Sequence, residues 1–182
     1  MRGFLAVELD SETRTLLCNI QQQLKNEGIR GNYTLPENFH LTNKFLGEID
    51  EVEFGKIKGL IKNVASRHNP FVLSLNFIGK FEKGNKIIFW AGLRRNESLQ
   101  NIYRDVELLL EPIQPSHGEK NFSPHITLVR EAVSPKVFSE IKTIKEGLEH
   151  VFPASGLSLM ESTRVEGQLT YIRRAFEPFL YE

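Results

Sequence analysis

Residues 39–47 read FHLTNKFLG, with apolar and polar side chains alternating over their first half. This alternation is typical of a β-strand that buries one face. Side chains two apart on a strand point the same way, so His40 and Thr42 share one face, while Phe39, Leu41 and Phe45 share the other. The segment is therefore predicted to be a strand that presents an imidazole beside a hydroxyl and buries its apolar side chains.

A second copy of this pattern lies further along the chain, where residues 122–130 read FSPHITLVR. His125 and Thr127 follow His40 and Thr42 by 85 positions. The same spacing, without a gap, separates other pairs: Phe4 and Phe89, Ala6 and Ala91, Glu12 and Glu97, Leu24 and Leu109. We interpret this spacing as an approximate internal duplication, with repeats at residues 4–81 and 87–165.

Each repeat is predicted to contain a strand, a helix, the His-x-Thr strand, a second amphipathic helix and a hairpin. Strands are expected at residues 4–9, 39–47, 71–81, 87–93, 122–128, 157–165 and 169–181, and helices at residues 11–28, 52–64, 99–110 and 137–148. The prediction is an α+β fold: one two-lobed domain, residues 1–182, with two mainly antiparallel sheets flanked by helices. Symmetric placement about the join would bring His40 and His125 to a central cleft.

The composition is that of an ordinary soluble globular protein, with 23 Lys and Arg balanced by 23 Asp and Glu. Zero net charge argues against a protein that coats long duplex nucleic acid, because such binding relies on a basic surface. No apolar run is long enough to suggest a membrane span, and the N-terminal residues turn acidic too early for a signal peptide. We therefore expect a cytoplasmic monomer that makes no membrane contact.

Two His-x-Thr motifs at equivalent places in a repeat favour catalysis over structure. A lone strand histidine is more often structural, but five histidines and eight threonines predict only roughly 0.2 such motifs by chance. A duplicated structural strand would explain the pair too, although a core position more naturally keeps an apolar residue than a desolvated imidazole. Two imidazoles with ordinary pKa values of about 6.5 suit in-line attack on a phosphodiester, one as base and one as acid.

The hydroxyls of Thr42 and Thr127 share the faces of the two histidines, where they would donate hydrogen bonds to phosphate oxygens. A metal site is the competing interpretation of paired histidines. His40 and His125 lie on different segments, however, and no Asp, Glu or Cys recurs with them at ligand spacing. We therefore predict no metal and no cofactor.

The motifs FHLTNKFLGEI and FSPHITLVR resemble the two signatures of the two-histidine phosphoesterases, and more closely those of the RNA 2′,3′-cyclic phosphodiesterase or 2′-5′ RNA ligase family. The resemblance covers nearly the whole chain and implies a bilobal fold with both motifs lining a cleft. It also implies hydrolysis of a terminal RNA 2′,3′-cyclic phosphate to a 2′-phosphomonoester, with His40 as proton donor and His125 as proton acceptor. Reversible, ATP-independent 2′-5′ RNA ligation is implied as the reverse chemistry.

The resemblance further implies that Thr42, Thr127 and Arg130 hold the phosphate, Arg130 supplying a fixed positive charge. Strict strand alternation places Arg130 opposite His125, so this role requires the strand to bend or end near Val129. Two alternatives remain open from the sequence. One is a related enzyme that opens the cyclic phosphate of a small nucleotide such as an ADP-ribose cyclic phosphate; the other is a non-catalytic RNA-end binding module.

Overall fold

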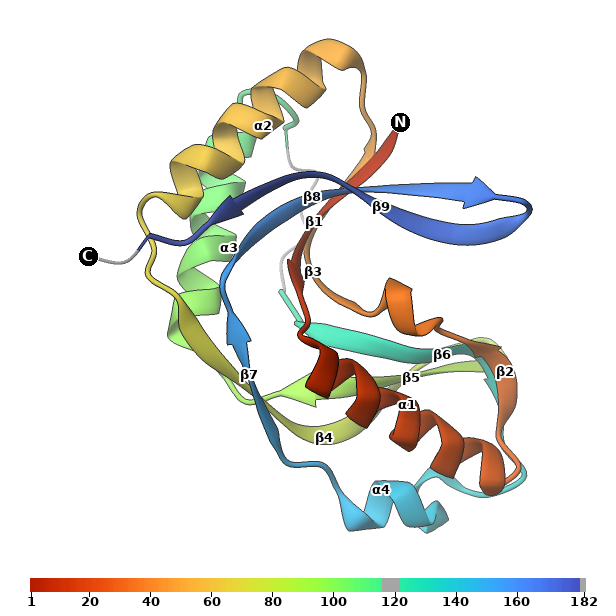
Figure 1. The fold of residues 1–182 in the computed structure, drawn as a ribbon. Helices are drawn as coiled ribbons and strands as arrows, with labels where there is room; N and C mark the ends of the chain where they lie inside the picture. Colours follow the sequence, from red (N-terminus) through yellow and green to blue (C-terminus); the bar gives the residue numbers. More distant parts are fainter. Residues whose placement is uncertain (116–121, 181–182) are drawn as a thin grey trace.

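The computed structural model describes residues 1–115 and 122–180, which form two antiparallel sheets with helices beside them (Figure 1). Every strand pairing is antiparallel, and the predicted α+β class with two sheets is confirmed. The first sheet has the order β3 (His40–Glu48), β1 (Arg2–Glu8), β8 (Gly156–Val165) and β9 (Gln168–Pro178). The second has the order β2 (Arg30–Tyr33), β6 (His125–Val133), β5 (Lys86–Leu93), β4 (Phe71–Lys83) and β7 (His150–Ala154).

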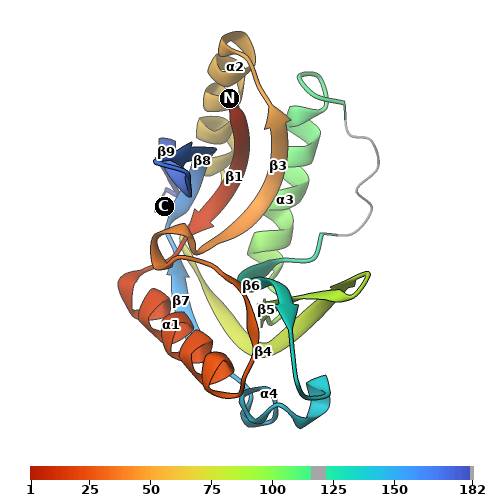
Figure 2. The same cartoon turned by 90° about the vertical axis from the view of Figure 1, so that its right-hand side faces the viewer.

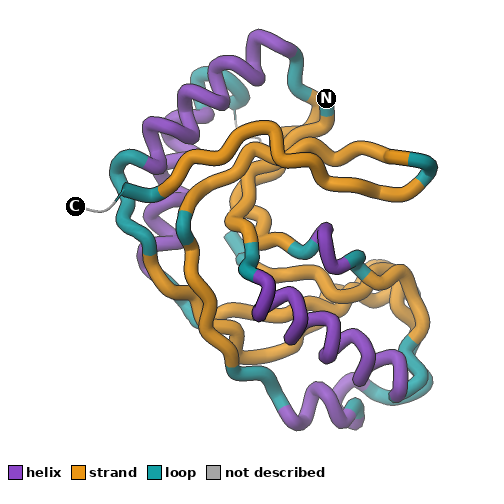
Figure 3. The backbone as a smooth tube through the Cα atoms, viewed as in Figure 1, coloured by secondary structure: helices purple, strands orange, loops and turns teal. Residues whose placement is uncertain are grey.

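The helices fall into two groups, and each group contains one helix from each half of the sequence. Their bounds are α1 Ser11–Asn26, α2 Glu51–Ala65, α3 Glu97–Leu110 and α4 Lys142–Glu146, with short 3-10 turns at Pro36–Asn38 and Phe138–Glu140. α2 and α3 pack on each other beside the first sheet, and α1 and α4 lie beside the second (Figures 2 and 3). Each sheet also combines strands from both halves. The β8–β9 hairpin of the second half, for example, lies in the same sheet as β1 and β3 of the first half.

The predicted helix over residues 137–148 is wrong. The structure has a 3-10 turn and then α4, a helix of 5 residues that ends at Gly147 with φ of 73°. A positive φ at this position stops the helix, and glycine adopts it without steric cost. The last strand is also shorter than predicted, ending at Pro178 rather than at residue 181, which lies outside the described residues.

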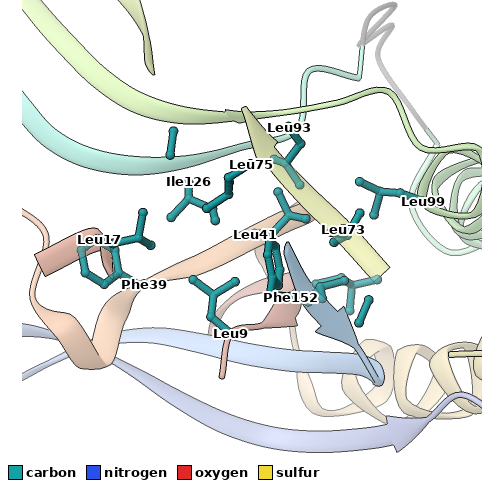
Figure 4. Close-up of a cluster of buried hydrophobic side chains, with 14 of the residues drawn as sticks. Leu9, Leu17, Phe39, Leu41, Leu73, Leu75, Leu93, Leu99, Ile126 and Phe152 are labelled. Carbon is teal, nitrogen blue, oxygen red and sulfur yellow. The ribbon is translucent and has the colours of Figure 1, made fainter. Parts of the chain in front are cut away.

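Buried side chains from both sheets join in one continuous cluster. Leu41 of β3, Ile126 of β6, Leu75 of β4 and Phe152 of β7 are all at most 1% exposed and lie close together (Figure 4). β3 and β6 thus turn their apolar faces, anticipated from the alternation in both motifs, toward a shared core. Their opposite faces are the ones that carry the histidines.

A β-bulge interrupts each histidine strand. In β3 the register against β1 passes from Ala6↔Thr42 to Leu5↔Lys44, so Asn43 has no opposite residue. In β6 the register against β5 passes from Trp90↔Thr127 to Phe89↔Val129, which leaves Leu128 unpaired. These two unpaired residues are again 85 positions apart. An extra residue reverses the alternation, so the side chain of Arg130 returns to the face of Thr127 although the strand runs on to Val133.

Candidate active site

A cavity of about 590 Å³ lies between the two sheets, and His40, but neither His125 nor Thr42, is among the described residues that line it. β3 contributes His40 to its lining, and β6 contributes Thr127 and Arg130. Residues of β2 and of β8 and β9 close to their connecting turn complete the wall, with Tyr171 of β9 beside His40. Residues from both halves of the chain therefore meet around one space.

The imidazole of His40 is fixed on both of its nitrogens. Nδ1 lies 2.7 Å from the carbonyl oxygen of Asn38, and Nε2 lies 2.9 Å from the hydroxyl oxygen of Thr42. A carbonyl oxygen can only accept, so Nδ1 carries a proton and, in the neutral ring, Nε2 accepts from Thr42. The rings of Phe4 and Tyr171 contact the imidazole, with centroids at 4.7 and 4.9 Å, and lie 5.0 Å from each other, so the three rings form one cluster.

His125 repeats this arrangement in the other half. Its Nδ1 lies 2.7 Å from the carbonyl oxygen of Ser123, the residue 85 positions after Asn38. The rings of Phe81 and Trp90 approach it at 5.0 and 5.7 Å. In both neutral imidazoles the proton thus lies on Nδ1 and Nε2 is unprotonated, the tautomer that a carbonyl two residues earlier selects.

The two histidines and Arg130 influence one another electrostatically. The pKa of His40 is lowered to about 4, chiefly by burial and in addition by Arg130, Arg14 and His125, whereas the hydrogen bond to Asn38 acts in the opposite direction. Burial and then Arg130 also lower the pKa of His125, against a hydrogen bond to Ser123. One guanidinium therefore acts on both imidazoles, and both rings are neutral near pH 7 in the unliganded site.

Several residues of this site carry no signal in the sequence. Asn38 is 4% exposed, and its side-chain amide donates to the carbonyl oxygen of Leu169 and accepts from the backbone N–H of Tyr171, at 2.8 and 3.1 Å. It thereby joins β9 to the segment that orients His40. Phe4 and Tyr171 carry no local signal either, because their role depends on strand pairing across the whole chain.

A family model matches most of this chain. Residues 19–166 match the family model described as the 2′-5′ RNA ligase superfamily. The chain belongs to this superfamily. It is similar to a protein named RNA 2′,3′-cyclic phosphodiesterase in Methanothermobacter thermautotrophicus, 30% identical over 133 residues and covering 71% of each chain. A protein of the same name in Thermus thermophilus is 32% identical over 170 residues, covering 89% of this chain and 82% of the relative.

Solved structures show the superfamily fold in the same arrangement. TT0787 of Thermus thermophilus superposes with a TM-score of 0.82 at 24% identity and covers 98% of both chains. LigT of E. coli in its apo form gives a TM-score of 0.75 at 21% identity, covering 97% of this chain and 96% of LigT. At these identities the likeness concerns the fold alone, and it extends over almost the full length of the chain.

The described residues offer neither a metal cluster nor a membrane-spanning helix. Residues 1–115 and 122–180 contain no group of three or more His, Cys, Asp or Glu side chains placed to hold a metal ion. Within the same ranges, none of the helices combines the length and apolar character needed to cross a membrane.

Proposed function

We propose that this member of the 2′-5′ RNA ligase superfamily hydrolyses the terminal 2′,3′-cyclic phosphate of RNA to a 2′-phosphomonoester. The observation that carries the proposal is the pair of imidazoles, each held through Nδ1 by a carbonyl and each presenting Nε2, with Arg130 acting on both. Relatives named RNA 2′,3′-cyclic phosphodiesterase support the same substrate.

In the proposed reaction a water molecule attacks phosphorus as the bond to the ribose 3′ oxygen breaks. His125 Nε2 takes the proton of the water, and His40 Nε2 gives a proton to the departing 3′ oxygen. The product keeps its phosphate on the 2′ oxygen, and the two histidines end with their protonation states exchanged. Each positioned acid or base contributes on the order of 10²–10⁴-fold.

Substrate binding favours the protonated form of His40 that the donor role requires, and the proton itself comes from solvent. A pKa of about 4 leaves His40 neutral in the free protein near pH 7. A bound phosphate anion stabilises the imidazolium, because an opposite charge within a few ångströms favours the charged form and raises the pKa. A protonated Nε2 no longer accepts from Thr42, so this hydroxyl is released to donate to a phosphate oxygen. Thr127 and Arg130 bind the other oxygens in the same proposal.

The first test uses an oligoribonucleotide that ends in 2′,3′-cyclic phosphate, in the presence of a chelator. We expect turnover by the unaltered protein and a loss of at least about 10²-fold in His40→Ala and in His125→Ala. His68→Ala is the matched control, since His68 pairs with Asp105 at 2.9 Å and lines none of the cavity described above. Turnover that disappears with chelator, or histidine variants as active as the control, would refute the mechanism.

The roles of the two histidines are tested with a leaving group that needs no proton. In a nucleoside 2′-(4-nitrophenyl phosphate), the 3′ hydroxyl attacks phosphorus and 4-nitrophenolate departs. This is the reverse sense of ring opening, so His40 becomes the base and His125 the dispensable acid. We expect His125→Ala to retain most of its activity on this substrate and His40→Ala to remain impaired. The opposite pattern would exchange the two roles.

The reverse reaction belongs to the same proposal. A ribose 5′ hydroxyl in the place of water would attack the cyclic phosphate and yield a 2′-5′ linkage without ATP. Because one chain supplies both imidazoles, a cytoplasmic monomer is sufficient for either direction. Size-exclusion chromatography together with activity at low protein concentration tests the monomer, since activity that falls with dilution would require a second subunit.

A further inference from the structure

A second cavity of about 330 Å³ adjoins the catalytic one. Arg130, Leu169 and Tyr171 line both cavities, so the two spaces share a wall at the residue that acts on both imidazoles. The second cavity then extends over the β1–β3 strand pair, away from β2. Its size is near the lower end of the roughly 300–1,000 Å³ of typical small-molecule sites.

Phe45 is the unusual residue of this second cavity. Its side chain is 59% exposed, whereas Phe4, the residue opposite it on β1, is 2% exposed. The two rings lie 6.2 Å apart, and Phe4 in turn contacts His40 at 4.7 Å. A row of contacting aromatic rings therefore links the imidazole of His40, through buried Phe4, to the exposed ring of Phe45.

The duplication shows why this ring faces the cavity. Phe45 lies 85 positions before Arg130, and each follows its own bulge by two residues, after Asn43 and Leu128 respectively. The bulge that returns Arg130 to the cleft therefore has a counterpart that returns Phe45 to it as well. Core packing does not require a phenylalanine here, because most of its surface meets solvent.

The charge of the second cavity complements phosphate. Arg2 and Arg130 line it, and no Asp or Glu is among its described lining residues. An exposed aromatic ring beside guanidinium groups is the combination that binds single-stranded RNA, through stacking of a base and attraction of the backbone. The neutral net charge of the chain conceals this local excess of positive charge.

We propose that the second cavity binds the penultimate nucleotide of the RNA, with its base stacked on Phe45. The inference rests on the proposed function, because it places the terminal nucleotide and its cyclic phosphate in the catalytic cavity. The phosphate that links the two nucleotides lies at the shared wall, within reach of Arg130, and Arg2 attracts the strand beyond it. The protein therefore prefers RNA ends over cyclic mononucleotides, which lack a base at this position.

The test compares adenosine 2′,3′-cyclic phosphate with the dinucleotide ApA ending in 2′,3′-cyclic phosphate. In the unaltered protein, kcat/KM for the dinucleotide should exceed that for the mononucleotide by about tenfold or more, the usual effect of one base–aromatic stack. Phe45→Ala should lower this ratio by about tenfold, leaving only the part that the linking phosphate contributes, and Phe45→Trp should keep it. Leu108→Ala, which truncates another exposed apolar side chain, 73% exposed on α3, should leave the ratio as it is.

A dinucleotide with an abasic penultimate residue completes a cycle of protein and substrate changes. Removing the base should lower kcat/KM of the unaltered protein by the same factor as Phe45→Ala does. Removing the base and the Phe45 ring together should lower kcat/KM no further than removing either one. The subsite would be overturned if the two losses in kcat/KM multiplied. It would also be overturned if Phe45→Ala left the dinucleotide-to-mononucleotide ratio of kcat/KM unchanged.

A binding measurement separates this inference from the proposed function. In the His40→Ala/His125→Ala protein, a dinucleotide with 2-aminopurine at the penultimate position should lose fluorescence on binding through stacking, and Phe45→Ala should restore it. Quenching that depends on Phe45 would support the subsite even if no cyclic phosphate were hydrolysed. Binding without a Phe45-dependent change would overturn the subsite while leaving hydrolysis intact.

Discussion

At the scale of single residues, Arg130 has two effects that are separable by experiment. Its charge lowers the pKa of His40 and of His125, and in the proposed reaction it also binds the phosphate. The first effect exists without substrate, because it depends only on the distance between fixed positive charge and imidazole. The second should appear only in turnover.

Arg130→Gln should therefore raise the pKa of both histidines toward 6.5, the ordinary value for the group. NMR titration of the imidazole C–H signals measures this change in the free protein. The same variant should lower kcat/KM for the cyclic phosphate by about a hundredfold, as expected for removing one donor to a developing charge. Arg164→Gln, which alters another arginine of the same cavity, is the control and should shift neither pKa. Unshifted histidines in Arg130→Gln would contradict the geometry.

The pH dependence of turnover follows from the lowered pKa values of His40 and His125. A base with a lowered pKa is free of its proton at lower pH, and a donor with a lowered pKa loses its proton at lower pH. The kcat/KM profile, which reports the free protein, should therefore be bell-shaped with both limbs below about pH 6.5. In kcat, the basic limb should move to higher pH because the bound phosphate raises the pKa of His40. A flat profile between about pH 5 and 8 would contradict paired imidazole catalysis.

At the scale of elements, alternation in the sequence predicts the two histidine strands but not their bulges. The burial of Leu41 and Ile126, and the placement of His40 and His125 on the opposite faces of their strands, follow from the two-residue period. Where a strand gains an extra residue depends on its partner, and the partner is not encoded in a local pattern. Strict alternation consequently places both Arg130 and Phe45 on the wrong face, and the prediction that Phe45 lies with Phe39 and Leu41 is wrong. The edge strands β2 and β7 escape prediction for a related reason, since each is too short to show a period.

The bulge in β3 has an energetic cost at Asn43. Its side chain is 3% exposed, and neither its Oδ1 nor its Nδ2 has a hydrogen-bond partner among the described residues. The equivalent position in β6 is Leu128, which is fully buried. Asn43→Leu keeps the branched shape and removes the desolvated amide, so the free energy of unfolding should increase by about 1–2 kcal/mol. Urea denaturation measures the free energy of unfolding. A decrease in this free energy would show that the amide has a partner or that leucine does not fit.

Glu27 joins the end of α1 to the start of α4. Its carboxylate accepts from the backbone N–H groups of Lys142 and Thr143, at 2.6 and 2.8 Å, and from the Thr143 hydroxyl. Burial raises the pKa of Glu27, but hydrogen bonds from Thr143, Lys142 and Lys136 outweigh burial and lower the pKa to about 2. A lowered carboxyl pKa stabilises the fold above the ordinary value of 4.5, and the effect is lost as pH falls toward 2.

Glu27→Gln should therefore lower the free energy of unfolding by about 1–3 kcal/mol near neutral pH. The difference from the unaltered protein should shrink as pH falls below the ordinary carboxyl value. Denaturant unfolding at neutral and at acidic pH measures both quantities. Glu166→Gln, at an exposed position in the β8–β9 turn, is the control and should change stability little. A pH-independent difference would mean that the charge of Glu27 is not the cause.

At the scale of the whole molecule, the duplication is readable from the sequence but the exchange between its halves is not. Periodicity shows which face of a strand is buried, and the 85-residue spacing shows which elements correspond. Neither shows which sheet a strand joins. The β8–β9 hairpin pairs with β1 of the first half, and α1 packs beside β6 of the second. Each lobe is therefore built from both repeats, and the cleft exists only when both are present.

This exchange predicts that neither half folds alone. A fragment of residues 1–84 would keep β1 and β3 but lose β8 and β9, and its β4 would lose both neighbours, β5 and β7. We expect it to show no cooperative thermal transition, because the core that its strands and α1 cover comes largely from the other fragment. A fragment of residues 85–182 should likewise show no cooperative thermal transition.

Mixing the two fragments should restore a cooperative transition and cyclic phosphate hydrolysis. The cut falls in the β4–β5 turn, where a side chain at Gly84 would meet no other atom within 4 Å, so new chain ends there disturb no packing. Calorimetry of each fragment, of the mixture and of the intact protein measures the expected pattern. A fragment of residues 1–84 that unfolds cooperatively by itself would show that one repeat is a complete lobe, and the histidines would then belong to two separable units rather than to one exchanged structure.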